Sequence, residues 1–179
     1  LRLKPKSVDA RNNLGNLLIL QGKIGEAVPQ YLETLKIDPQ NAEGHYYLAG
    51  ALARQKKMSE AVTHFQAALK IKRDYAAAAN DLAWILATET NGAIRKVEEA
   101  VRWAERACEL TTNQVAGYLD TLGVAYSEAG RFKEAVEATE RAVVRAIASG
   151  DNDMARRIES RLAQYRAGRP YHEASTSAP

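Results

Sequence analysis

The chain has 179 residues, of which 46% are hydrophobic and 26% charged, and its formal net charge is +3. This composition is typical of a globular protein with a sizeable core, and so small a net charge gives no argument for nucleic-acid binding. No apolar run approaches the roughly 18 residues that a membrane-spanning helix needs, so no membrane contact is expected either.

One short phrase recurs four times along the chain. It reads LQGKIGEAV at residues 20–28, RQKKMSEAV at 54–62, VEEAV at 97–101 and EAGRFKEAV at 128–136. The alanines of these phrases lie 34, 39 and 35 residues apart, and a second marker, a small residue after a leucine, keeps nearly the same period. The members of that second marker are Gly15, Ala49, Ala83 and Gly123. Self-similarity at such a period predicts a solenoid of stacked units.

Each unit has the pattern of two helices. In the first unit, apolar residues at helical spacing precede a break at Gly22 and resume from Ala27 to Leu35. The small residues are expected where the two helices of a unit cross closely. Asp38-Pro39 closes the first unit, because proline cannot continue a helix. Asn41, Asp74 and Asn113 occupy positions where helix N-caps are expected.

These markers resemble those of the tetratricopeptide repeat, a helix-turn-helix unit of about 34 residues with a leucine, a small residue, an alanine, an aromatic residue and a closing proline. Tyr31 and Phe65 fill the aromatic position, whereas Ala104 and Thr139 replace it later. The resemblance implies an all-α, right-handed α-solenoid. We expect four units at about residues 8–41, 42–75, 76–115 and 116–149, within a repeat region spanning 7–150.

The ends of the repeat region differ from its middle. Residues 1–6 resemble the remnant of a preceding repeat, so we expect the chain to be a fragment of a longer protein. Met154, Ile158, Leu162 and Tyr165 predict an amphipathic capping helix at residues 151–168, with Arg161 among the arginines of its solvent face. Residues 169–179 are expected to form a disordered tail. The last third of the chain also resembles the C-terminal repeat blocks of large bacterial proteins.

In this repeat family the first helices of successive units line a concave surface, and the resemblance implies that partners bind there. The residues one turn from the small-residue positions are amides, aromatics and one carboxylate. They are Asn12, Asn16, Tyr46, Asn80, Trp84 and Asp120. Asn can bond either main-chain group of an extended peptide, and Tyr and Trp provide large anchors with a polar tip. We therefore expect a groove that binds an extended peptide or a partner segment.

The sequence contains no motif that points to catalysis. It has no phosphate-binding glycine loop, no paired His or Cys at metal-ligand spacing, and a single cysteine, Cys108. We expect a non-catalytic scaffold without a cofactor or metal. Two alternatives remain open. One is a module that self-associates through an exposed N-terminal end, and the other is a substrate-recruiting appendage of an upstream membrane glycosyltransferase-like enzyme. The compartment is not encoded in these residues.

Overall fold

The computed structural model describes residues 8–172, and within that range it contains nine α-helices and no strand. The helices are α1 (Val8–Leu20), α2 (Ile24–Ile37), α3 (Ala42–Arg54), α4 (Met58–Ile71), α5 (Ala76–Thr88), α6 (Val97–Leu110), α7 (Ala116–Glu128), α8 (Phe132–Ala148) and α9 (Asn152–Arg166). The prediction of an all-α helical-repeat solenoid is confirmed. The predicted remnant at residues 1–6 lies outside the described residues, as do residues 173–179 of the predicted tail.

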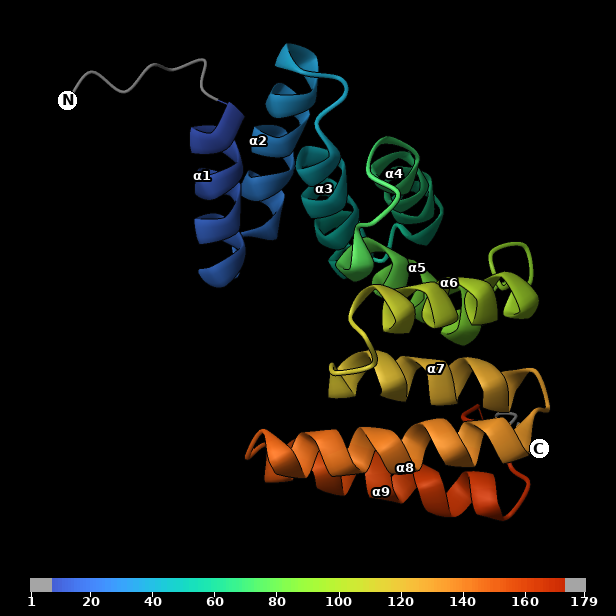
Figure 1. Cartoon of the computed structure of the whole chain (residues 1–179). Coiled ribbons are helices and arrows are strands. Elements are labelled where there is room, and N and C mark those ends of the chain that lie inside the picture. The colour runs from blue at the N-terminus through green and yellow to red at the C-terminus, as the bar shows by residue number, and fades with distance from the viewer. Residues whose placement is uncertain (1–7, 173–179) are drawn as a thin grey trace, which may run out of the picture. The chain divides into compact units, whose positions relative to one another are not determined.

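The chain divides into two compact units, here called unit 1 (described residues 8–78) and unit 2 (79–172). In unit 1, α1 packs on α2, α2 on α3, and α3 on α4 (Figure 1). The aromatic positions predicted from the repeat, Tyr31 and Phe65, are fully buried in this unit, and so are the repeat alanines Ala27 and Ala61. The alternation of one large and one tiny side chain allows neighbouring helices to interlock.

The small residue of the first repeat is required by a close approach between α1 and α2. A Cβ atom added to Gly15 would lie 2.4 Å from the Tyr31 Cε1 atom, well inside van der Waals contact. In the fourth repeat, a Cβ atom on Gly123 would lie 2.3 Å from Thr139 Oγ1. Gly15 and Gly123, the small residues of the first and fourth repeats, therefore lie where the two helices of a unit approach closely.

Two predicted N-caps have different outcomes. Asn41 accepts a hydrogen bond from the Gly44 N–H at 2.7 Å and caps α3 as predicted. The prediction for Asn113 is wrong, because α7 begins after Val115, which makes no side-chain cap. Asn113 instead adopts a φ of +57° in the turn that ends α6, and its N–H donates to the Cys108 carbonyl at 2.7 Å. Asparagine tolerates this left-handed backbone region better than most residues, so it serves the end of one helix rather than the start of the next.

Unit 2 continues the same helix-on-helix packing. Here α6 packs on α7, α7 on α8, and α8 on α9 (Figure 1). The apolar stripe of α9 is buried as the sequence predicts, through Ala155, Ile158, Leu162 and Tyr165. Arg161 is an exception to its predicted solvent-facing role. Its side chain is only 20% exposed and forms an ion pair with Asp120 of α7, so α9 is held to the unit by charge as well as by apolar contact.

Candidate functional site

The two candidate asparagines of α1 are committed to the packing of unit 1. Asn12 is 3% exposed, and its Nδ2 donates to Asn41 Oδ1 at 3.3 Å, the same oxygen that caps α3. Asn16 accepts a hydrogen bond of 2.8 Å from the Tyr31 hydroxyl through its Oδ1. Burial raises the pKa of Tyr31 to about 12, so this hydroxyl remains a donor at neutral pH. Both amides thus tie helices together.

Tyr46, the third candidate of unit 1, lies in an aromatic cluster. Its ring centroid is 4.8 Å from that of Tyr75, 5.5 Å from that of Tyr47 and 5.8 Å from that of Phe65, all in tilted geometry. Tilted aromatic pairs at these separations are favourable beyond the area that they bury. Three neighbouring rings of its own unit therefore contact Tyr46.

A pair of histidines joins α3 to α4. The sequence did not predict that these two residues would lie together. His45 Nδ1 and His64 Nδ1 are 2.9 Å apart, and His45 Nε2 is 3.2 Å from the Pro39 carbonyl. A carbonyl only accepts, so His45 Nε2 carries the proton and its Nδ1 accepts from His64. Burial, and secondarily the neighbouring His45, lowers the pKa of His64. The described residues contain no group of three or more potential metal ligands.

The three candidates of unit 2 lie in different surroundings. Asn80 donates from Nδ2 to the adjacent Asp81 carboxylate at 3.0 Å. Asp120 is 8% exposed and receives Arg161 Nε at 2.9 Å, with a second hydrogen bond from Arg161 Nη2. Burial raises the pKa of Asp120, and the charge of Arg161 opposes that effect. Asp120 is thus engaged by α9.

Trp84 is partly exposed, and its ring contacts the chain segment that follows α9. Its ring centroid lies 5.6 Å from that of Tyr171 in an edge-to-face arrangement with an interplanar angle of 63°. The Arg161 guanidinium lies 6.0 Å from the centroid of the same Tyr171 ring. The structure therefore brings Trp84 and Asp120 to one place, linked through Tyr171 and Arg161.

Main-chain hydrogen bonds fix the same segment on α7. The Tyr171 N–H donates to Ser127 Oγ at 3.3 Å, and the His172 N–H donates to Glu128 Oε1 at 2.7 Å. We call Trp84, Ser127, Glu128 and Arg161 the tail-contact site. Ser127 and Glu128 were not predicted from the sequence, because they lie at the polar end of α7 and are not repeat markers. The one available signal was Tyr171, an aromatic residue in a stretch otherwise expected to be disordered.

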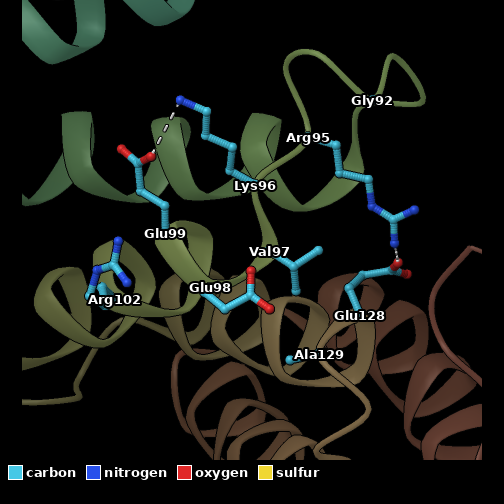
Figure 2. Close-up of a pocket in the computed structure, with 9 residues that line it drawn as sticks. All are labelled: Gly92, Arg95, Lys96, Val97, Glu98, Glu99, Arg102, Glu128 and Ala129. Carbon is cyan, nitrogen blue, oxygen red and sulfur yellow. Dashed lines mark hydrogen bonds and ion pairs between the residues drawn. The ribbon is translucent and has the colours of Figure 1, made fainter.

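Glu128 also borders a broad hollow of about 620 Å³. Figure 2 shows Arg95, which comes from the longer link of the third repeat, directed at the Glu128 carboxylate, and the two form an ion pair. On the other side of the hollow, Lys96 Nζ lies 3.8 Å from Glu99 Oε2, while the side chain of Glu98 points away from Lys96 (Figure 2). The longer link thus supplies a partner for the C-terminal end of α7. Two ion pairs, Arg95 with Glu128 and Lys96 with Glu99, therefore line this hollow.

Cys108 has the surroundings of an unreactive thiol. It is buried in α6, and burial raises its pKa to about 11. A thiolate is the reactive form of cysteine, so this thiol is poorly suited to nucleophilic work at neutral pH. In the described part of the chain, no helix combines the length and apolar character needed to cross a bilayer.

Comparison with known proteins agrees with the repeat structure. Two sequence models described as tetratricopeptide repeat match the chain, one over residues 1–42 and 12–76 and the other over 115–148. No curated protein sequence matches the chain. Among solved structures, MamA is similar with a TM-score of 0.70 at 20% identity, and the match covers 82% of each chain.

Two further structures share the fold. The type IV pilus biogenesis factor PilW has a TM-score of 0.67 at 18% identity, covering 89% of this chain and 78% of its own. YrrB, titled a TPR protein with an unusual peptide-binding site, has a TM-score of 0.65 at 17% identity and coverage of 92% and 89%. The repeat markers, the helix pairs and these matches lead to one conclusion: the chain belongs to the tetratricopeptide-repeat family.

Proposed function

We propose that the chain is a non-catalytic scaffold that binds an extended segment of another protein on the α5 and α7 side of unit 2. The observation that carries this proposal is the partly exposed ring of Trp84, which makes an edge-to-face contact with the non-helical segment that follows α9. Tryptophan is among the residues that contribute most to binding energy at protein interfaces. Tetratricopeptide-repeat proteins generally act through protein partners, and titles such as that of YrrB describe peptide binding for a relative in fold.

The candidates of unit 1 support a smaller role in binding. Asn12 donates from Nδ2 to Asn41 and Asn16 accepts from Tyr31 through Oδ1, so one polar group of each side chain is already engaged within unit 1. Tyr46 belongs to an aromatic cluster. We therefore place the binding surface in unit 2, where Trp84 and the acceptors on α7 face a segment that is not part of any helix.

The test is selection of peptides from a random display library against the immobilised full chain, followed by calorimetric titration. We expect selected peptides to lose about tenfold or more in affinity with Trp84→Ala, since truncating a hot-spot anchor costs 2 kcal/mol or more. Asn80→Ala with Trp84→Ala should weaken binding further. A matched control is Arg106→Ala, because Arg106 is an exposed residue of α6 that pairs with Glu109 on its own helix. Selected peptides that bind all of these variants equally would contradict the proposal.

A specific observation also favours self-association as a second candidate. Leu14, Leu17 and Leu20 of α1 are exposed, Leu20 at 83%, and together they form an apolar edge on unit 1. Such edges promote contact with another apolar surface. A contact of this kind should persist at high salt, whereas one steered by charge should weaken. Light scattering of the full chain and of Leu17→Ser at 0.1 M and 1 M salt checks this, and a monomeric wild type at both salt concentrations excludes it.

A further inference from the structure

We propose that Tyr171 and His172 are a built-in ligand. They occupy, within the same chain, the surface on which unit 2 binds its partner, and the partner segment carries an aromatic residue in the place of Tyr171. This inference rests on the proposed function and adds two features to it: the chemistry of the partner segment, and competition between that segment and the chain's own C-terminal residues.

The first argument is the way in which α7 holds the segment. Two successive main-chain N–H groups, of Tyr171 and His172, donate to side-chain acceptors, Ser127 Oγ and Glu128 Oε1. Bonds to main-chain groups are how proteins hold extended peptides with little demand on most of their side chains. Another segment with the same backbone course can make both bonds. The tail-contact site therefore has the polar half of a peptide-binding site.

The second argument is the aromatic selectivity of the position filled by Tyr171. Its ring lies edge-to-face with Trp84 and within 6.0 Å of the Arg161 guanidinium. Both contacts depend on the quadrupole of an aromatic ring and are lost with an aliphatic side chain. Arg161 is held in place by Asp120, so α7 and α9 prearrange this contact. A partner segment with Tyr, Phe or Trp at this point is accordingly favoured over one with Leu or Ala.

The third argument concerns the carboxylate of Glu128. Its side chain is 1% exposed, and it is bonded by Arg95 and by the His172 N–H, with His172 Nδ1 3.2 Å away. A buried carboxylate that loses a donor is destabilised, because water does not fully replace the lost bond. Departure of the segment leaves this requirement open, and the main chain of a partner satisfies it. A partner segment that supplies the same N–H therefore restores the hydrogen bond that Glu128 loses when Tyr171 and His172 leave.

The fourth argument is that the segment can leave without disturbing α9. The helix ends where the Gly168 N–H donates to the Tyr165 carbonyl and the Arg169 N–H to the Gln164 carbonyl. Gly168 has a φ of +67°, a conformation that glycine adopts without strain and that ends helices. The buried stripe of α9 lies entirely before this turn. Rotation beyond Gly168 releases Tyr171 and His172 while the cap stays packed.

The experiment uses the full 179-residue chain and a fluorescein-labelled, acetylated peptide with the sequence of residues 167–174, AGRPYHEA. Anisotropy titrations give the dissociation constant for wild type, Tyr171→Ala and the matched control Tyr171→Phe. We expect Tyr171→Ala to bind the peptide about tenfold more tightly than wild type, because a tethered segment competes at an effective concentration near the millimolar range. Tyr171→Phe keeps the ring and should stay within about twofold of wild type.

Further measurements test whether the peptide binds at the place of Tyr171. Adding Trp84→Ala to Tyr171→Ala should remove the gain, and a peptide with alanine in place of tyrosine should not bind. In parallel, the indole N–H signal of Trp84, assigned with Trp103→Phe, should shift in Tyr171→Ala and return toward the wild-type position when the peptide is added. That second measurement stands if the double variant proves unstable.

Equal affinity of wild type and Tyr171→Ala, or a gain that survives Trp84→Ala, overturns the inference. So does failure of Tyr171→Ala to bind the peptide. These outcomes are separable from failure of the scaffold function. A display-selected peptide that requires Trp84 but binds wild type and Tyr171→Ala equally leaves the scaffold standing and removes only the built-in ligand. If neither protein selects any peptide, the scaffold proposal itself fails.

Discussion

Unit 1 and unit 2 are built from the same repeat, yet the candidate binding positions differ in what they contact. In unit 1, Asn12 and Asn16 bond to residues of neighbouring helices and Tyr46 packs among aromatic rings. In unit 2, Trp84 meets a short non-helical segment. The difference shows that local packing decides whether a side chain at such a repeat position is available to a ligand.

The largest expected effect in solution tests the ionic anchor of unit 2. Asp120→Ala leaves the largely buried Arg161 charge without its partner, so we expect the free energy of unfolding to fall by about 3 kcal/mol. Urea unfolding followed by circular dichroism measures this loss. Asp120→Leu with Arg161→Met should recover most of it, because removing both charges avoids the unpaired one.

A matched control for this pair is an exposed ion pair on α9, the helix that carries Arg161. Asp153 and Arg156 of α9 also form an ion pair, but their side chains are 75% and 74% exposed. Asp153→Ala should therefore cost only about 0.5 kcal/mol. Equal losses for Asp120→Ala and Asp153→Ala would show that the ion pair of Asp120 and Arg161 contributes little to holding α9 on unit 2.

The next effect tests the close helix crossing of unit 1. Gly15→Ala places a methyl group against the buried Tyr31 ring, and overpacking of this kind costs about 1–3 kcal/mol. Gly50→Ala, in α3 of the same unit, meets open space and should instead stabilise by about 0.5–1 kcal/mol through helix propensity. Thermal and urea unfolding of both variants checks the opposite signs. Stabilisation by both substitutions would show that Tyr31 moves aside at little cost.

The smallest effect is a pH dependence confined to unit 1. The folded pKa of His64 is lowered by burial and by His45, with Glu60 acting weakly in the other direction. Between that value and the unfolded pKa of about 6.5, the unfolded state binds more protons, so stability falls as the pH drops through this window. Hydrogen exchange should show that α3 and α4 open more readily at pH 5.5 than at pH 7.5, relative to the other helices.

The control for the pH effect is His64→Gln, which removes the titrating group. In this variant the pH dependence of α3 and α4 opening should flatten, while that of α8 stays as in wild type. An unchanged pH dependence in His64→Gln would assign the effect to another group and leave the histidine pair without a role in stability.

The sequence by itself determined the repeat, the helix pairs and the residues that fill the cores. Repeat markers at a period near 34 report which side chains must be tiny or large, and Gly15 with Tyr31 shows that this requirement is steric and local. Helical periodicity likewise identified the buried stripe of α9. Such features depend on neighbours a few turns away, so a linear pattern contains them.

Only the tertiary structure decided which polar residues are engaged and by what. Asn12 and Asn41 are 29 residues apart, Asp120 and Arg161 are 41 apart, and Glu128 and His172 are 44 apart, and none of these pairings is marked by a repeat. Hydrogen bonds and ion pairs require atoms within about 3 Å in suitable geometry, and that condition is met only after the helices have packed. The periodic apolar pattern builds the scaffold, and the packed scaffold then selects the polar contacts that form on it.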